Sequence, residues 1–536
     1  MNLGIYGFGP EGRRKWLAVD LGVAFANPEI PGIDLIMPDV RFLVEERKNI
    51  VGLVLTHGHE DHVGALVDLW PKLGCPVYTT SFTAALAEAR RLSEPGAPKI
   101  PLHVVPSGGR VMIGPFEVEF VPVAHSIPDS HALALRTPLG LVVHTGDWKI
   151  DPTPVVGNVT DPVRFAALGA EGVRAVICDS TNAIRDGISP SEADVARELA
   201  TLIAAAPHRV AVTTFASNVA RVRSIAEAAH AAGRDVVLVG RAMERVVTVA
   251  REQGLLDGLP PLRPAEAYGY LPRDKVVAIL TGSQGEPRAA LNRIAEDDHP
   301  EIALSAGDTV IFSSRTIPGN ERAVNRIINA LILDGIRVIT DRDGLVHVSG
   351  HPRRGELEQM YAWLKPQLAV PVHGEPLHLA EHAELASRMG VPEVVRIVDG
   401  DLLRLAGGPA EVVDELPVGR LYKDGQVLVS SEAKVIAERR RLSYAGVVSI
   451  AVAMSGKGEV VGDPMIDLTG LPEEGVGGRA IAEVIEDAVL DCLDGLPKPR
   501  RRDADAVAES LTRAVRAAVN AAWGKKPLCH ALVITV

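Results

Sequence analysis

The feature that most limits how this chain can fold is a dense run of metal-binding side chains, HGHEDH (57–62), directly after a predicted strand at 50–57. Three imidazoles and a carboxylate within six residues suit borderline divalent ions such as Zn²⁺. The first two histidines can reach one ion, whereas Asp61 and His62 lie one step further along and can reach a second. One loop cannot complete two sites, so the fold must bring further ligands from distant segments.

Three more candidate ligands, His125, Asp147 and His373, each stand at the end of a predicted strand. Side chains at the carboxyl ends of neighbouring strands project into a shared crevice, so we expect them to meet there. A carboxylate can bridge two ions, and Asp147 is the expected bridge. The predicted first site is His57, His59, His125 and Asp147, and the predicted second site is Asp61, His62, Asp147 and His373.

Short β-branched runs alternate with alanine-rich stretches, such as 191–206 and 219–233, over most of the 536 residues. This alternation is typical of α/β layers with largely buried strands. The length predicts two or three domains. After a polar segment at 431–446, the remaining residues 447–536 read as two strands and two helices, which predicts a small α+β domain.

Composition excludes several classes of protein. The four cysteines, Cys75, Cys178, Cys492 and Cys529, form no CxxC pair, which disfavours a zinc–thiolate site and fits a reducing compartment. The sequence shows neither a signal-peptide pattern nor an apolar run of about 20 residues, so we expect a cytoplasmic protein without a membrane span. The net charge of −12 does not indicate nucleic-acid binding, although bound dications can reverse the local sign.

The order and spacing of the candidate ligands resemble the metallo-β-lactamase fold. That resemblance also implies an early aspartate that orients a ligand from behind, matched here by Asp20 in WLAVDLG (16–22). Asp147 and His373 are 226 positions apart, far more than the minimal fold needs. The βα pattern of 196–345 therefore predicts an inserted domain of roughly 150 residues.

With this insert the sequence resembles the β-CASP nucleases, and within them the ribonuclease J family. Their three additional motifs are matched by Asp179 in CDSTNA, His351 in HVSGH (347–351) and His373 in PVHGE. The segments TFASNVARV (214–222), TGSQGEP (281–287) and IPGNE (317–321) are similar to ribonuclease J in particular, and the resemblance covers essentially the whole chain.

The resemblance implies a metallo-β-lactamase αββα sandwich with an inserted β-CASP α/β domain and a small C-terminal α+β domain. The metallo-β-lactamase domain would be built from two stretches of chain that flank the insert. The expected boundaries are 1–195 for its first part, 196–345 for the insert, 346–430 for its second part, 431–446 for a linker and 447–536 for the C-terminal domain.

The implied activity is metal-dependent RNA hydrolysis, 5′→3′ and exonucleolytic, which endonucleolytic cleavage can accompany, in RNA processing and mRNA decay. Two divalent ions, zinc or alternatively manganese, would carry a bridging hydroxide that attacks the phosphodiester. The expected catalytic residues are Asp61, His62, Asp179 and His351. His351 would protonate the leaving oxygen or hold the phosphate, and Asp179 would orient His351. A plain turn or helix-cap role for Asp179 stays open.

Similarity to the family also implies a subsite for the 5′-phosphate of single-stranded RNA. Its donors would come from the HVSGH segment and from the FASN segment, although Ser217 is equally compatible with a simple turn. The expected substrate-binding residues are Ser217, Asn218, Val219, His347, Val348, Ser349, Gly350 and His351.

The sequence departs from the family pattern in two places. Family members usually begin with a glycine-rich strand that ends in GEIGMN, and here Met1-Asn2 resembles the last two residues, which predicts a late start or a truncation. An ancillary calcium is also known near the segment matching Gly32-Ile33-Asp34. The glycine- and aspartate-rich loop of the family reads DGQVLVSS (424–431) here, so Asp34 is predicted to be a turn residue instead.

Other readings remain. A tRNA 3′-processing nuclease or a thioester hydrolase of the same fold is disfavoured by the long gap, but a DNA-directed β-CASP nuclease is not excluded, because a 2′-hydroxyl contact cannot be read from sequence. A non-catalytic scaffold of an RNA-decay complex would have lost ligands, and all seven are present. By resemblance the C-terminal domain mediates a homodimer or homotetramer, with a passive appendage as the alternative. The arginine runs 439–441 and 500–502 are expected on solvated surface.

Overall fold

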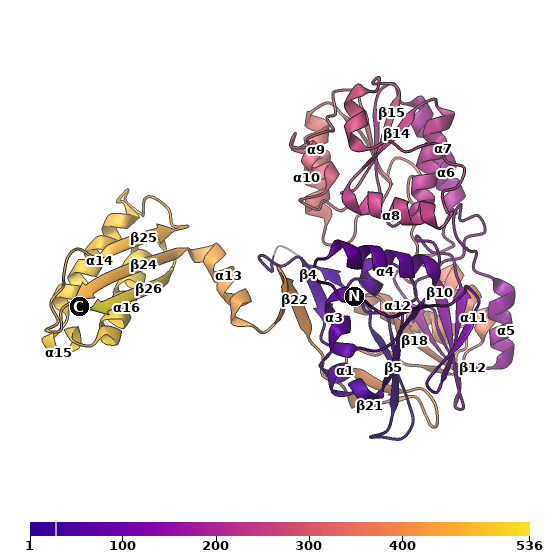
Figure 1. The fold of residues 1–536 in the computed structure, drawn as a ribbon, viewed down its shortest axis with the longest axis horizontal. Helices are drawn as coiled ribbons and strands as arrows, with labels where there is room; N and C mark the ends of the chain where they lie inside the picture. Colours follow the sequence, from indigo (N-terminus) through magenta and orange to yellow (C-terminus); the bar gives the residue numbers. More distant parts are fainter. Residues whose placement is uncertain (27–28) are drawn as a thin grey trace. The chain divides into compact units, whose positions relative to one another are not determined.

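The computed structural model describes residues 1–26 and 29–536. The chain forms two compact units, each with its own core (Figure 1). The first unit is Met1–Ala24 with Met37–Val418, and the second is Phe25–Ile36 with Gly419–Val536.

Two sheets packed face to face form the centre of the first unit. Apolar side chains from both sheets, among them Leu17, Val54, Phe120 and Leu133, form one buried cluster between them. The first sheet contains, in spatial order, β1 (Gly4–Phe8), β2 (Lys15–Val19), β5 (Ile50–Val54), β6 (Val77–Thr79) and β7 (Leu102–Val104). The second contains β19 (Glu393–Val394), β18 (Leu368–Val372), β12 (Val173–Asp179), β11 (Gly140–His144), β10 (His131–Thr137), β9 (Phe116–Pro122) and β8 (Arg110–Ile113).

Helices cover the sandwich, which confirms the predicted αββα architecture (Figure 1). A second buried cluster joins the outer face of the larger sheet to its helices and includes Phe165, Leu357 and Leu385. These helices are α5 (Pro162–Glu171), α11 (Arg354–Leu364) and α12 (Pro376–Arg388). The helical segments that alternate with the strands of the smaller sheet are α1 (Arg41–Glu45), η1 (Arg47–Asn49), α2 (Glu60–Val63), α3 (Leu66–Leu73) and α4 (Ser81–Ser93).

The predicted insert is a parallel sheet with helices on both faces, placed in the chain between β12 and β18. One buried cluster joins α6, α7 and α8 to one face, and another joins α9 and α10 to the other face. The strands, in spatial order, are β14 (Asp235–Val239), β15 (Val276–Leu280), β13 (Val210–Thr213), β16 (Thr309–Phe312) and β17 (Arg337–Ile339). The helices are α6 (Glu192–Ala205), α7 (Val219–Ala231), α8 (Arg241–Glu252), η2 (Ala265–Tyr270), α9 (Ala290–Ala295) and α10 (Glu321–Leu333).

The first unit ends with an antiparallel pair, β20 (Asp401–Arg404) and β21 (Glu411–Glu415). Residues 419–430, which the sequence analysis placed in the second part of the metallo-β-lactamase domain, cluster instead with the second unit. Most of the expected linker at 431–446 is helical, as α13 (Lys434–Ala445), and it also belongs to the second unit.

The second unit contains the predicted α+β domain. Two long helices pack on one face of a three-stranded sheet, and a four-stranded sheet includes the short N-terminal segment of this unit. The three strands are β25 (Met465–Thr469), β24 (Val447–Met454) and β26 (Leu528–Thr535), with helices α14 (Ile481–Gly495), α15 (Lys498–Arg501) and α16 (Ala504–Trp523). The four-stranded sheet contains β23 (Val427–Ser430), β22 (Arg420–Asp424), β4 (Leu35–Pro38) and β3 (Ala24–Phe25).

Three remaining expectations can be compared with the structure. Asp424, in the segment considered for calcium, forms an ion pair with Arg439 at 2.7 Å, so this arginine is not simply solvated. All four cysteines are free. Among the residues that the structure describes, none of the helices combines the length and apolar character needed to cross a bilayer.

Candidate metal centre and active site

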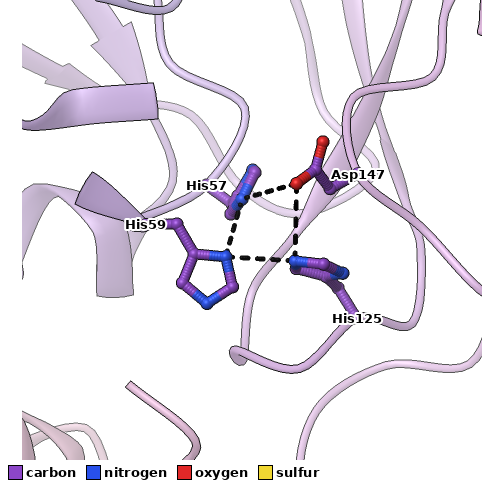
Figure 2. Close-up of side chains that lie close together, drawn as sticks. All are labelled: His57, His59, His125 and Asp147. Carbon is purple, nitrogen blue, oxygen red and sulfur yellow. Dashed lines mark hydrogen bonds and ion pairs between the residues drawn. The ribbon is translucent and has the colours of Figure 1, made fainter. Parts of the chain in front are cut away.

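Four ligand atoms converge in the first predicted site, from His57, His59, His125 and Asp147 (Figure 2). The Nδ1 atom of His59 lies 3.1 Å from Nε2 of His57 and 3.1 Å from Nε2 of His125. Oδ2 of Asp147 lies 3.8 and 3.7 Å from those two Nε2 atoms. Ligands about 2.1 Å from a tetrahedral zinc ion lie about 3.4 Å from one another, so the spacing fits such an ion.

The second predicted site is assembled around the same aspartate. Nε2 of His62 lies 3.2 Å from Oδ2 of Asp147 and 3.5 Å from Oδ2 of Asp61. Nε2 of His373 lies 3.3 Å from Oδ2 of Asp61. These spacings also fit a metal–ligand distance near 2 Å. The structure thus brings together all seven predicted ligands, with Asp147 between the two groups.

The convergence follows from strand direction. His125, Asp147 and His373 come after β9, β11 and β18, which run in the same direction within one sheet, and the 57–62 loop follows β5 of the other sheet. Carboxyl ends of both sheets therefore meet at one edge. His373 sits in the left-handed region at φ 55°, a strained conformation for a non-glycine residue that is typical of functional sites.

Hydrogen bonds behind the imidazoles orient them. Nδ1–H of His125 donates to the carbonyl oxygen of Gly350 at 2.6 Å, which turns its Nε2 toward the site. Nδ1–H of His62 donates to Oδ2 of Asp20 at 2.7 Å, and the same carboxylate accepts from the amide and hydroxyl of Thr56. Such partners set the tautomer of a ligand histidine and strengthen it as a ligand. Asp20 lies where the sequence analysis expected it, behind a ligand.

The histidines of the cluster have pKa values shifted in opposite directions by their surroundings. Burial lowers the pKa of His57 and His125 and lowers that of His59 to about 4, so these three are neutral imidazoles at pH 7. Burial would also lower the pKa of His373, but neighbouring carboxylates, Asp147 first, raise it to about 10. The carboxylates similarly raise the pKa of His62. The carboxylates of the second group therefore favour the protonated forms of His62 and His373.

Asp179 and His351 form a pair beside the seven ligands. Nδ1–H of His351 donates to Oδ2 of Asp179 at 2.7 Å, and the same nitrogen lies 3.8 Å from Oδ2 of Asp147. Oδ1 of Asp179 accepts from the amide of Thr181 at 2.9 Å, so this aspartate holds a turn and orients a histidine at once. Burial opposes charge on His351, yet Asp179 and Asp147 raise its pKa. Its side chain is 21% exposed and remains reachable.

Comparisons with known proteins agree along the chain. Family models match residues 31–170 as the metallo-β-lactamase superfamily, 207–331 as the ribonuclease J β-CASP domain, 335–397 as a Zn-dependent metallo-hydrolase RNA specificity domain and 434–536 as the ribonuclease J C-terminal domain. The chain is 54% identical to ribonuclease J of Sinorhizobium meliloti over all of its own length and 95% of that protein. The chain belongs to the ribonuclease J family.

Other relatives carry the same name. Ribonuclease J of Mycobacterium tuberculosis is 38% identical over 97% of this chain and 93% of its own length, and that of Thermus thermophilus is 36% identical over 97% and 91%. A crystal structure of a protein of unknown function from Enterococcus faecalis V583 matches with a TM-score of 0.51 at 16% identity, over 76% of this chain and 96% of that chain. This last likeness shows the fold alone.

The HVSGH segment of this ribonuclease J family member lies against the active site. Besides the Gly350 carbonyl that holds His125, Ser349 Oγ accepts from Nδ2 of Asn182 at 2.9 Å, and the same amide donates to the carbonyl oxygen of His351. Asn182 was not identified from the sequence. The segment CDSTNA could have pointed to it, because it stands three residues after Asp179.

The other expected substrate-binding residues differ in what they expose. Val219 and Val348 are buried among apolar side chains, so only their backbone could contact RNA. Asn218 is buried and caps α7, its Oδ1 accepting from the amide of Arg221 at 2.9 Å. His347 has a buried Nδ1 for which the described residues offer no hydrogen-bond partner. Burial first, then the charges of Arg221, Lys149 and Arg315, lower its pKa and keep it neutral.

A fully buried set of charges stands behind this segment. Nζ of Lys149 lies 2.8 Å from Oδ2 of Asp151 and 3.8 Å from Oε1 of Glu192, and the guanidinium of Arg221 donates to Oε2 of Glu192 at 2.9 Å. Arg221 also donates to the carbonyl oxygen of Val346 at 3.0 Å, one residue before HVSGH begins. We call Lys149, Asp151, Glu192 and Arg221 the buried charge network. It joins the strand-end segment after Asp147 to the insert.

Proposed function

We propose that the protein is a metal-dependent ribonuclease that hydrolyses RNA phosphodiester bonds. The observation that carries this proposal is the pair of four-ligand groups sharing Asp147, with the His351–Asp179 pair next to it, in a chain of the ribonuclease J family. Metal binding explains why so many buried imidazoles face one another in this cluster.

We propose two divalent ions, zinc or alternatively manganese, one in each group. When bound, the ions supply an activated water and neutralise charge on the phosphate. The protein's own part is to hold the ligands in place: Gly350 and Asp20 orient two of the imidazoles, and the strand ends set their spacing.

The role proposed for His351 is proton donation to the leaving 3′-oxygen from its Nε2. Its Nδ1–H donates to Asp179, and Asp179 and Asp147 raise the pKa of the ring against the effect of burial, which favours the protonated form that a proton donor needs. Asp179 acts through His351 as a positioning residue and does not itself reach the substrate.

We propose that the HVSGH and FASN segments receive a 5′-monophosphate through the substrate-binding residues expected in them. Such a subsite would favour 5′→3′ exonucleolytic cleavage, with endonucleolytic cleavage as a second mode. Support comes from the buried Nδ1 of neutral His347, for which the described residues offer no hydrogen-bond partner and which a phosphate oxygen could therefore engage. Because Ser349 and Gly350 are also tied to Asn182 and His125, the subsite is joined to the metal centre.

For the C-terminal unit we propose self-association into a homodimer or homotetramer. The face of its sheet opposite α14 and α16 exposes large apolar side chains, Met465 at 75%, Leu532 at 65% and Ile534 at 58%. Exposed apolar patches of this kind mark protein contacts. Light scattering of wild type and of Leu532→Lys tests this, and an unchanged mass would reject the proposal. We also propose a cytoplasmic location, to be tested by cell fractionation.

The function is tested by incubating zinc- or manganese-loaded protein with a 5′-monophosphate RNA, its 5′-hydroxyl twin and the matching DNA. Asp61→Ala/His62→Ala serves as the control variant. We expect mononucleotides from the monophosphate RNA only, and none from the variant. Equal cleavage of DNA would indicate a DNA-directed nuclease, and cleavage of none by metal-loaded protein would favour a scaffold in an RNA-decay complex.

A further inference from the structure

Asn2 lies directly against the second ligand group, although no motif analysis assigned it a role. Its backbone amide donates to the carbonyl oxygen of Asp61 at 2.7 Å, and its carbonyl oxygen accepts from the amide of Gly22 at 3.0 Å. Its side-chain Nδ2 donates to Oδ2 of Asp61 at 3.2 Å and lies 2.9 Å from Nε2 of His62. One residue thus touches two of the four candidate ligands of this group.

Asp61 is the ligand that most needs such support. Its side chain is 40% exposed, against 3% for His62, 3% for Asp147 and 19% for His373. An exposed carboxylate on a one-turn helix samples several rotamers, and fixing one rotamer costs entropy. In the described part of the chain, its carboxylate contacts His62, His373 and Asn2, and of these Asn2 alone is not a candidate ligand.

The backbone around Asn2 is held independently of its side chain. The segment 20–22 packs so tightly on the ligand loop that a Cβ on Gly22 would lie 1.7 Å from the carbonyl oxygen of Asp61. The Leu21 amide donates to the carbonyl oxygen of His62 at 2.7 Å in the same layer. Replacing the side chain of Asn2 therefore leaves its two backbone hydrogen bonds available and removes the amide donor, which reaches the backbone carbonyl oxygen of Asp61 at 3.2 Å as well as its carboxylate.

We propose that Asn2 is a positioning residue of the metal centre, whose side-chain amide holds the carboxylate of Asp61 toward His62 and His373 and so strengthens the second ion's site selectively. The proposal rests on the two ligand groups and not on the identity of the nucleic-acid substrate. A partner that orients a ligand in this way contributes about 10- to 100-fold to metal affinity.

The test is Asn2→Leu, which keeps the same number of side-chain heavy atoms in the same branching and removes the donor. Asn49→Leu is the matched control, because Nδ2 of Asn49 also donates to a carboxylate, that of Glu46 at 2.8 Å, just before β5 and away from the ligand loop that follows it. Both proteins are stripped of metal and titrated with zinc against a chelator. A parallel titration with Co²⁺, followed by its absorption spectrum, distinguishes the two binding steps.

We expect the binding step that fills the second group to lose about 10- to 100-fold in affinity in Asn2→Leu, with the other step and the thermal midpoint of the metal-free protein unchanged. Asn2→Gln, which keeps an amide donor, should recover part of the loss, and Asn49→Leu should match wild type. Unchanged zinc affinity in Asn2→Leu would overturn the proposal. So would an equal loss at both steps or a lower midpoint without metal, since either would indicate general support of the loop.

Discussion

The seven-ligand cluster and the buried charge network are neighbouring polar regions built on opposite principles. In the cluster, imidazole nitrogens and carboxylate oxygens lie 3.1–3.8 Å from one another, so several potential metal-ligand atoms converge on a point. In the network, Lys149 and Arg221 alternate with Asp151 and Glu192, so every charge faces its opposite. The first arrangement brings together potential ligand atoms for a cation, whereas the second pairs each charged group with one of opposite sign.

This difference distinguishes buried polar residues that bind a metal ion from those that stabilise the fold. Buried charges persist when they are paired or coordinate a metal. The ligand cluster should therefore determine activity and metal content with little effect on the metal-free fold. The network should determine stability and the placement of HVSGH, without itself binding an ion.

The largest expected effect comes from removing the charge that both ligand groups share. Asp147→Asn should lower RNA cleavage by more than about a thousandfold and reduce bound zinc below two ions per chain, because the bridge loses its charge. Cleavage assays with metal analysis check this, with Asp186→Asn, an exposed aspartate, as the control. Full metal content and near-normal cleavage would show that Asp147 does not bridge.

Breaking the network should act on stability instead. Arg221→Met leaves Glu192 buried without its arginine, which should cost about 3–5 kcal/mol of unfolding free energy. Denaturant unfolding of the metal-free protein checks it, and Arg221→Met/Glu192→Gln should recover part of the loss. An unchanged unfolding free energy, or a loss of zinc sites in the folded variant, would remove the distinction between the two regions.

The His351–Asp179 pair stands between the two kinds of region, because His351 is paired like the network but lies within reach of Asp147. Because His351 is the proposed proton donor, His351→Gln should lower cleavage by about 10²- to 10³-fold and leave both zinc ions bound. Single-turnover cleavage and zinc analysis of the same sample check this. Loss of one ion would instead make His351 a metal ligand.

The smallest expected effect is the release of protons when zinc binds. His373, with a pKa near 10, and His62, with a raised pKa, are protonated at pH 7 in the metal-free cluster, but a ligand imidazole must be neutral. Zinc binding at pH 7 should therefore release about one to two protons, and affinity should fall as the pH falls. Calorimetry in buffers of different ionisation enthalpy checks this, and binding without proton release would contradict the electrostatics described for the second group.

The fold and the convergence of the seven candidate ligands were largely predictable because their signals are local. The HGHEDH run is contiguous, and His125, Asp147 and His373 each follow a recognisable strand, so strand direction alone brings them together. The long interval between Asp147 and His373 likewise predicted the insert, and the structure contains a parallel sheet there. In each case a residue's position in its own segment carries the information.

Only the tertiary structure decided which residues stand behind these ligands. Asn2 contacts Asp61 across 59 positions, Asn182 contacts Ser349 across 167, and Arg221 meets Glu192 between two helices. An asparagine or an arginine carries no local pattern that names its partner, and the same side chain is usually solvated. The partners are selected by packing, which removes water and leaves a buried donor only the acceptors that the fold places within reach, so the sequence determined the chemistry of the site and the tertiary structure determined its support.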